Sequence, residues 1–318
     1  MAFADKDAKR TKFQEWKRDW AKDLRRNKAI YIMFIPVLTY FIIFSYIPMV
    51  GAQIAFREFR PVHGMWGSPW VGFDHFRTFL GNFYFWRLIR NTLAINFYDI
   101  LFGFPAPIIL ALLINEIRNT FVKRVTQTVS YLPFFVSVVV VAGMIRNFFG
   151  GGGIVNDVLM QFGILETPFR FMTEPGWFRP IFVGSLIWQN AGWGSIIYLA
   201  ALTSIDQELY EAASIDGAKR LKQLWHITLP GIMPTILIMF ILRVGSIMTV
   251  GFERVLLLYN ENVFETADVI STFVYRQGIL AGNFSYSTAV DLFNSVINLT
   301  VLVSVNYFCR RKFEQSLW

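Results

Sequence analysis

Six apolar stretches, each long enough to cross a membrane as a helix, constrain this 318-residue chain more than any other feature. A spanning helix needs about 20 mostly apolar residues, because each residue advances about 1.5 Å across about 30 Å of hydrocarbon. The stretches are approximately 29–51, 92–114, 126–145, 180–203, 231–250 and 289–307. Several contain proline, which neighbouring helices accommodate in a bundle. The sequence therefore predicts an all-α polytopic membrane protein with six transmembrane helices.

Composition supports this class and excludes others. Hydrophobic residues make up 54% of the chain and charged residues 16%, whereas soluble domains have about 45–50% and about 25%. These proportions argue against a disordered chain and against an ordinary soluble enzyme. A single cysteine, Cys309, excludes a disulfide-stapled secreted fold.

The placement of the positive charges predicts the orientation. Nineteen of the 30 Lys and Arg residues lie in the N-terminal tail, the second and fourth gaps between stretches, and the C-terminal tail. Short basic loops stay in the cytoplasm. Both termini are therefore predicted to be cytoplasmic, and the three longer gaps extracytoplasmic. This topology explains the net charge of +8 without any binding of nucleic acid.

The N-terminal tail, residues 1–28, has an amphipathic pattern. Phe13, Trp16, Trp20 and Leu24 follow helical spacing, and basic residues lie between them. The pattern predicts a short helix lying in the headgroup region of the membrane; the alternative is a passive orientation signal. The remaining residues, 29–318, are predicted to form one membrane domain, with the first apolar stretch retained rather than cleaved.

Catalytic motifs were not found. The chain has no G-x-x-x-x-G-K-[ST] phosphate loop and no nucleophile motif, and none of its three histidines has a second ligand at metal-binding spacing. The sequence therefore predicts a non-catalytic protein with no metal site. A membrane-embedded enzyme is the weakest alternative, since it lacks a catalytic constellation.

The fourth gap, about 204–230, holds the most specific pattern in the chain. Asp206 can cap a helix, Gly217 can end it with a positive φ, and a second amphipathic helix then leads to a proline at the start of the next stretch. The residues that define the pattern are Glu211, Ala212, Ala213, Gly217, Ile227, Leu229 and Pro230. This predicts a rigid cytoplasmic helix–turn–helix.

These residues fill the pattern E-A-A-x₃-G-x₉-I-x-L-P, which is the signature of membrane subunits of binding-protein-dependent ABC importers. Over about residues 29–318 the chain resembles the MalF-type carbohydrate permeases, and within them the LplB-like branch associated with uptake of oligo- and polysaccharides. The resemblance implies a type I ABC importer permease fold in the bacterial cytoplasmic membrane.

The resemblance also implies a mechanism and partners. The coupling contacts to a separate ATPase would be Glu211, Ala212, Ala213, Asp216 and Gly217, and Ile227, Leu229 and Pro230 would set the second helix against the membrane. The expected partners are a second permease subunit, two ATPase subunits, an extracytoplasmic solute-binding protein and a sugar. The chain itself would bind no cofactor, because ATP and Mg²⁺ would belong to the ATPase.

Polar and aromatic side chains inside the stretches are candidates for the substrate pathway, because sugars are bound by hydrogen bonds and by stacking on aromatic rings. The candidates are Trp188, Gln189, Asn190 and Trp193 in the fourth stretch, Arg243 and Ser246 in the fifth, and Asp291, Asn294 and Asn298 in the last. The competing interpretation is that such groups hold helices together. In that case Arg243 would pair with Asp291 or with Asp99.

An ion-coupled secondary transporter of a small polar solute is the alternative function. Asp99 and Asp291 would then supply carboxylates along the pathway. That alternative leaves the Glu-Ala-Ala loop unexplained.

Overall fold

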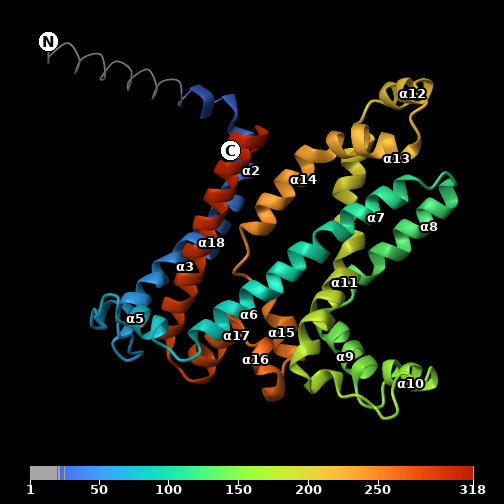
Figure 1. Ribbon diagram of the computed structural model, residues 1–318. Coiled ribbons are helices and arrows are strands. Elements are labelled where there is room, and N and C mark those ends of the chain that lie inside the picture. The colour runs from blue at the N-terminus through green and yellow to red at the C-terminus, as the bar shows by residue number, and fades with distance from the viewer. Residues whose placement is uncertain (1–19, 21, 25, 318) are drawn as a thin grey trace. The chain divides into compact units, whose positions relative to one another are not determined.

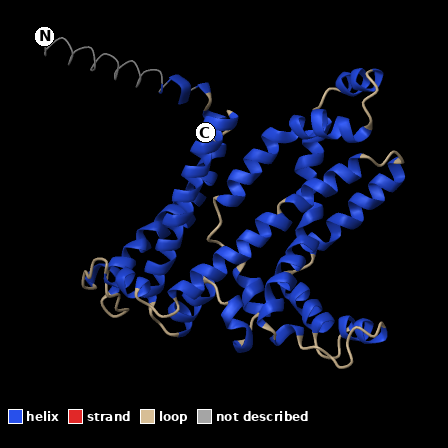
Figure 2. Ribbon diagram, in the orientation of Figure 1, coloured by secondary structure: helices blue, strands red, loops and turns tan. Residues whose placement is uncertain are grey.

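The computed structural model describes residue 20, residues 22–24 and residues 26–317. In this part of the chain the regular elements are helices, and one isolated antiparallel bridge joins Arg57 to Trp70 (Figure 2). The predicted tail helix falls largely outside the described residues, which include neither Phe13 nor Trp16. It therefore stays a prediction.

The chain divides into two compact units, residues 1–54 with 59–68, and residues 55–58 with 69–318. In the first unit, α2 (Lys28–Phe41), the π-helix η1 (Ile42–Tyr46) and α3 (Ile47–Val50) follow one another without interruption. The 3₁₀ helix η2 (Gly51–Phe56) begins at the end of α3, and α4 (Gly64–Gly67) follows. None of the side chains of α2, η1 and α3 is buried, as expected for a helix whose surroundings are lipid or partner chains.

The second unit contains the remaining helices, and the long helix α11 (Pro175–Thr203) packs most extensively against α7 and also against α8, α14 and α16 (Figure 1). The elements before α11 are α5 (Asp74–Leu80), α6 (Phe85–Tyr98), η3 (Asp99–Gly103), α7 (Pro105–Asn115), α8 (Thr120–Tyr131), η4 (Leu132–Phe135), α9 (Val138–Phe149), α10 (Ile154–Gln161) and η5 (Phe171–Thr173). Those after it are α12 (Gln207–Ile215), α13 (Arg220–Gln223), η6 (Leu224–Thr228), α14 (Leu229–Val244), α15 (Phe252–Leu258), η7 (Glu261–Val263), α16 (Phe264–Ala267), α17 (Ile270–Tyr275), η8 (Arg276–Leu280) and α18 (Phe284–Phe313).

Five helical segments of the described residues are long and apolar enough to cross a membrane: Lys28–Phe56, Phe85–Asn115, Val138–Gln161, Arg220–Val244 and Phe284–Phe313. The predicted fourth span lies within α11, a continuous helix of 29 residues that contains the polar pair Gln189 and Asn190. Its length allows it to cross, and its polar residues reduce its apolar character. The all-α polytopic fold predicted from the sequence is confirmed.

Close packing of α11 on its neighbours depends on a glycine. A Cβ added to Gly192 would lie only 1.8 Å from the carbonyl oxygen of Ser130 on α8. No side chain fits there, so glycine lets the two backbones approach, as small residues do between membrane helices.

The third predicted span is not one continuous helix. The stretch 126–145 breaks between η4, which ends at Phe135, and α9, which begins at Val138. Pro133 lacks a backbone N–H, and Ser137 caps α9 by accepting a hydrogen bond from the N–H of Val140 at 3.3 Å. The side-chain amide of Gln189 donates a hydrogen bond to the carbonyl of Val136 at 2.6 Å, which gives this carbonyl a partner at the break.

Candidate functional site

The loop that carries the Glu-Ala-Ala pattern begins with the predicted capped helix. The carboxylate of Asp206 accepts a hydrogen bond from the N–H of Glu208 at 3.0 Å, and α12 follows. The helix ends at Ile215, and Gly217 has a φ of +73°, a left-handed value that glycine adopts without strain. The predicted helix start and glycine stop are therefore both confirmed.

The second half of the loop folds back on the first. The side-chain amide of Gln223 donates to Ser214 Oγ at 2.9 Å, and the hydroxyls of Tyr210 and Thr228 lie 3.0 Å apart. Pro230 lies at the start of α14, directly after the π-helix η6, and has no backbone N–H to donate. These bonds make α12, α13 and η6 one braced hairpin, which we call the α12–α13 loop.

The α12–α13 loop protrudes from one end of the bundle formed by the second unit (Figure 1). Glu211 and Ala212 are exposed on it and Ala213 is partly exposed. Large apolar side chains are exposed as well, notably Ile215 at 87%, Leu221 at 70% and Trp225 at 62%. Apolar side chains that lie together on an exposed, protruding loop are typical of a surface that binds another protein.

The base of the loop is held by the bundle. Ile227 packs against a buried cluster that includes Leu202 at the end of α11, Ile205 just after it and Ile232 from α14. Arg220 also forms an ion pair with Glu116 at 3.1 Å, just beyond the end of α7. Most of the predicted coupling residues thus lie on this loop, and Leu229 and Pro230 begin the helix α14, into which it continues.

A groove runs along one face of α11. It consists of two adjoining pockets of about 470 and 480 Å³ that share Ile187. The first, toward the Pro175 end, includes Tyr98, Phe102, Arg179 and Thr266 in its lining. The second includes Asp99, Asn190, Tyr198, Arg243 and Ser246. The α11 residues in the two linings recur at helical spacing, so both pockets belong to one face, which we call the α11 groove.

An ion pair lies in the second pocket. Arg243, near the end of α14, pairs with Asp99, which begins the π-helix η3. A Cβ added to Gly103 would lie 2.2 Å from Asp99 Oδ1, so glycine makes room for the carboxylate. Of the two pairings left open by the sequence, the structure forms the one with Asp99. Short π-helical segments often occur at functional sites.

The predicted pathway residues divide between the groove and other places. Asn190, Arg243 and Ser246 line the second pocket. Trp188 lines a third pocket, which includes Val141 and Met144 and shares Pro180 and Gly184 with the first. Trp193 stacks on Phe134 with ring centroids 4.7 Å apart.

The other predicted pathway residues also lie outside the groove lining. Gln189 is buried. Its amide donates a hydrogen bond to the carbonyl of Val136, and its side-chain oxygen accepts one from the guanidinium of Arg254. Asn298 forms hydrogen bonds with Met248 and Thr249. Neither Asp291 nor Asn294 lines either pocket. Contact of any of the predicted residues with a substrate stays a prediction.

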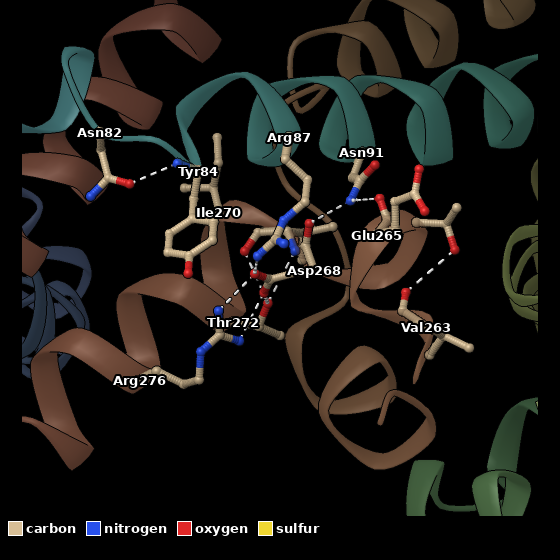
Figure 3. A network of polar contacts seen from close by, with 12 residues as sticks. Asn82, Tyr84, Arg87, Asn91, Val263, Glu265, Asp268, Ile270, Thr272 and Arg276 are labelled. Carbon is tan, nitrogen blue, oxygen red and sulfur yellow. Dashed lines mark hydrogen bonds and ion pairs between the residues drawn. The ribbon is translucent and has the colours of Figure 1, made fainter. Parts of the chain in front are cut away.

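A buried carboxylate that the sequence reasoning did not identify organises the Pro175 end of α11. Asp268 is fully buried and accepts hydrogen bonds from both terminal nitrogens of Arg276, at 2.8 and 2.7 Å (Figure 3). Arg87 on α6 reaches it at 3.2 Å and the hydroxyl of Thr272 at 2.8 Å. Burial lowers the pKa of Arg276, but hydrogen bonding and the charge of Asp268, aided by Tyr259, outweigh burial and raise it above its ordinary value. We call this group the Asp268 cluster.

The cluster extends to α11 through Asn91 on α6. The amide of Asn91 donates to the carbonyl oxygens of Glu265 and Asp268, at 2.9 and 3.0 Å, and its oxygen accepts from Arg179 at 2.9 Å (Figure 3 shows the first part). Asp268 is separated from Arg87 by 181 positions, so no local pattern reveals the cluster. Among the described residues no group of His, Cys, Asp and Glu is arranged to hold a metal ion.

The structure is that of a polytopic helical membrane protein with a braced, exposed loop before one of its spans. Residues 103–313 match the family of binding-protein-dependent transport system inner membrane components, and the chain belongs to that family. It is 46% identical to protein LplB of Bacillus subtilis over 298 residues, covering 93% of each chain. It is 40% identical to YteP, a polygalacturonan/rhamnogalacturonan transport system permease of the same organism, over 296 residues, covering 93% of this chain and 92% of the relative.

A solved structure is similar over nearly the whole chain. It is a bacterial alginate ABC transporter in complex with alginate pentasaccharide-bound periplasmic protein, and the matched chain has a TM-score of 0.86 at 42% identity. The match covers 93% of this chain and 99% of the other. The predicted ABC importer permease family and its six-helix fold are therefore confirmed. The chain is a multi-pass membrane subunit of a binding-protein-dependent transport system.

Proposed function

We propose that this chain forms half of the translocation pathway of an ATP-driven importer of oligo- or polysaccharide. A second permease subunit supplies the other half, two ATPase subunits bind at the α12–α13 loops, and an extracytoplasmic binding protein delivers the sugar. The observation that carries the proposal is the braced, exposed loop that presents Glu211 and Ala212 beside exposed apolar residues. ATP and Mg²⁺ belong to the ATPase subunits, and this chain binds no cofactor.

The proposed orientation follows from the same loop. An ATPase is cytoplasmic, so the α12–α13 loop and both termini lie in the cytoplasm, in agreement with the basic residues of the tails and short loops. The Pro175 end of α11 then faces outward. In this arrangement residues 1–28 form the interfacial tail, and residues 29–318 form the permease domain with its coupling loop at about 204–230.

Force transmission is explained by continuity of the helices. The π-helix η6 passes directly into α14, which ends beside the groove with Arg243. Because the loop is braced internally by Gln223 and Tyr210, a push on it moves the start of α14 rather than deforming the loop. Closure of two ATPases is thereby converted into movement of the groove wall.

The saccharide substrate is supported by the relatives and by the groove. Two matched proteins are described as transporting polygalacturonan/rhamnogalacturonan and alginate. The α11 groove combines amide, hydroxyl and charged groups with the rings of Tyr98, Phe102 and Tyr198. Hydrogen-bonding groups beside aromatic faces suit the hydroxyls and ring faces of sugars.

The test is Glu211→Lys in the assembled transporter. We expect uptake of saccharide into ATP-loaded proteoliposomes to fall by more than about tenfold, because reversing one charge at a docked interface costs several kcal/mol. Co-purification with the ATPase should weaken in parallel. The matched control is Glu166→Lys, since Glu166 is also exposed but precedes α11, far along the chain from the loop. Unchanged uptake with Glu211→Lys, or uptake that needs an ion gradient and no ATP, would overturn the proposal.

A further inference from the structure

Two carboxylates near the Pro175 end of α11 are paired with three guanidinium groups. Arg87 and Arg276 share the carboxylate of Asp268, and Arg90 lies 3.9 Å from the carboxylate of Glu265. Arg179 forms no ion pair within the described part of the chain. Its Nη2 donates to Asn91 Oδ1 at 2.9 Å and its Nε to the carbonyl of Thr266 at 3.4 Å. Both acceptors are neutral, and the carboxylate of Glu265 acts on Arg179 through its charge without forming an ion pair with it.

The surroundings of Arg179 make that charge costly in the absence of a ligand. Its side chain is half-buried and lines the first pocket of the α11 groove, whose other walls include Pro180, Val183 and Ile187. A guanidinium has five N–H donors, and the two contacts above use two of them. A cation beside apolar walls is stabilised when an anion enters and takes the remaining donors.

The same pocket has an aromatic wall. Tyr98 and Phe102 lie one helical turn apart, with ring centroids at 6.4 Å and an angle of 12° between the ring planes. The two residues are 40% and 54% exposed, so both rings are accessible. The pocket volume of about 470 Å³ falls within the range of roughly 300–1,000 Å³ that is typical of small-molecule sites. An anion-binding group thus lies beside flat apolar surfaces in a space large enough for a sugar.

We propose that the first pocket of the α11 groove is a binding subsite for a carboxylate-bearing sugar residue. Arg179 binds the carboxylate through its planar guanidinium, whose paired donors match the two carboxylate oxygens. Tyr98 and Phe102 pack against the sugar ring. The subsite rests on the proposed function, since it lies on the route of an imported saccharide, and it makes uronic-acid oligosaccharides the substrate class.

The position of the subsite gives it a role in entry. It shares Ile187 with the second pocket, so a chain bound at Arg179 can extend along α11 toward Asn190 and Arg243. In the second pocket Asp99 already neutralises Arg243. The first pocket is therefore the part of the groove that discriminates by charge, and the second receives what the first admits.

The experiment compares an oligogalacturonate with its methyl ester, which keeps the rings and removes the charge. Uptake of each is measured in proteoliposomes that contain the whole transporter, its binding protein and ATP. The binding protein is the same for wild type and variant, so its own preference cancels when the acid-to-ester uptake ratios are compared. We expect Arg179→Gln to lower that ratio about tenfold, the size of effect expected for one charge-assisted hydrogen-bonded contact. Arg179→Lys should retain part of the preference.

The matched control is Arg90→Gln, which removes a positive charge at the same end but outside the lining of the first pocket; it should change the ratio less than twofold. Phe102→Leu is the second variant, because it keeps every charge: uptake of acid and ester should fall together. It also tests the pocket if Arg179→Gln does not assemble with its partners.

Phospholipid headgroups are the other source of anions, and the lipid composition separates them from the substrate. The effect of Arg179→Gln on the ratio should be the same in zwitterionic and in anionic vesicles. A fall in both sugars seen only with anionic lipid would make the pocket a phosphate site and overturn the proposal. An unchanged ratio with Arg179→Gln, or wild-type uptake of neutral sugars alone, would overturn it while leaving the proposed function intact. ATP-driven uptake of no saccharide at all by the wild type would instead contradict the proposed function.

Discussion

Asp268 and Asp99 are both aspartates that pair with arginines from distant parts of the chain, yet their settings differ. Asp268 is fully buried and is held by two arginines and a threonine hydroxyl. Asp99 has one ion-pair partner, Arg243, whose side chain is 41% exposed, and the pair lines a pocket. A carboxylate with several donors, such as Asp268, fixes the fold. A carboxylate with one ion-pair partner, such as Asp99, is able to change partner.

The elements that the two aspartates connect differ in the same way. The Asp268 cluster joins α6 to the segment from Glu265 to Arg276, and it reaches α11 through Asn91. The Asp99–Arg243 pair joins η3 to the end of α14, the helix that continues from the α12–α13 loop. Because α14 continues directly from the loop, we expect a movement of the loop to act on the second contact and not on the first. We infer that the Asp268 cluster is part of the fixed frame and that the Asp99–Arg243 pair closes and opens during transport.

The largest effect on stability is expected for Asp268→Asn. Removing the charge leaves Arg276 and Arg87 without their carboxylate in a buried setting, which costs about 3–5 kcal/mol of unfolding free energy. The measurement is the yield and thermal unfolding midpoint of the purified protein in detergent. Glu265→Gln is the control, because the Glu265 side chain is 72% exposed and its ion pair with Arg90 is long; exposed pairs contribute about 0–1 kcal/mol. Equal midpoints for the two variants would show that the cluster does not fix the frame.

Variants of the Asp99–Arg243 pair should change stability less than Asp268→Asn does, and their main effect should be on ATP-driven uptake. Asp99→Asn and Arg243→Gln should each lower the unfolding free energy by less than Asp268→Asn does, because only the Asp99 side chain is buried, at 8% exposed, whereas Arg243 is 41% exposed. ATP-driven uptake should nevertheless fall roughly tenfold, which corresponds to about 1.4 kcal/mol of lost coupling.

The double variant with exchanged charges, Asp99→Arg with Arg243→Asp, should recover part of the uptake. Recovery would show that the two side chains act on each other, and a double-mutant cycle measures their interaction. If either single variant unfolds the protein as strongly as Asp268→Asn does, the distinction between the two aspartates is wrong.

Local signals made the α12–α13 loop predictable. Asp206, Gly217 and Pro230 each specify backbone conformation through their own chemistry, and the structure places a cap, a left-handed turn and a helix start at those residues. The apolar stretches likewise follow from hydropathy alone. The prediction of one continuous helix at 126–145 was wrong, because Pro133 and the capping residue Ser137 divide the apolar run into two helical parts.

Side-chain direction was not predictable from residue type. Gln189 and Asn190 are neighbours on α11, but successive helical residues differ by about 100° in direction. Asn190 therefore lines the groove, whereas Gln189 is buried against the break after η4. The Asp268 cluster and the setting of Arg179 were missed because they join residues from separate elements. Only packing brings those residues together.

The smallest change in transport among these predictions is expected for Asn298→Ala, and this variant tests which polar residues of the spans form the pathway. Asn298 Oδ1 accepts a hydrogen bond from the N–H of Met248 at 2.9 Å, and its amide donates to Thr249 Oγ1 at 3.0 Å. These bonds fix the chain just after α14, so the variant should lose about 1 kcal/mol of stability and keep the wild-type KM for uptake. Asn190→Ala, a groove variant, should show the reverse, with a raised KM and an unchanged unfolding midpoint. A raised KM for Asn298→Ala at an unchanged midpoint would place Asn298 on the pathway. It would also mean that a hydrogen bond to the backbone does not separate structural residues from residues that contact the substrate.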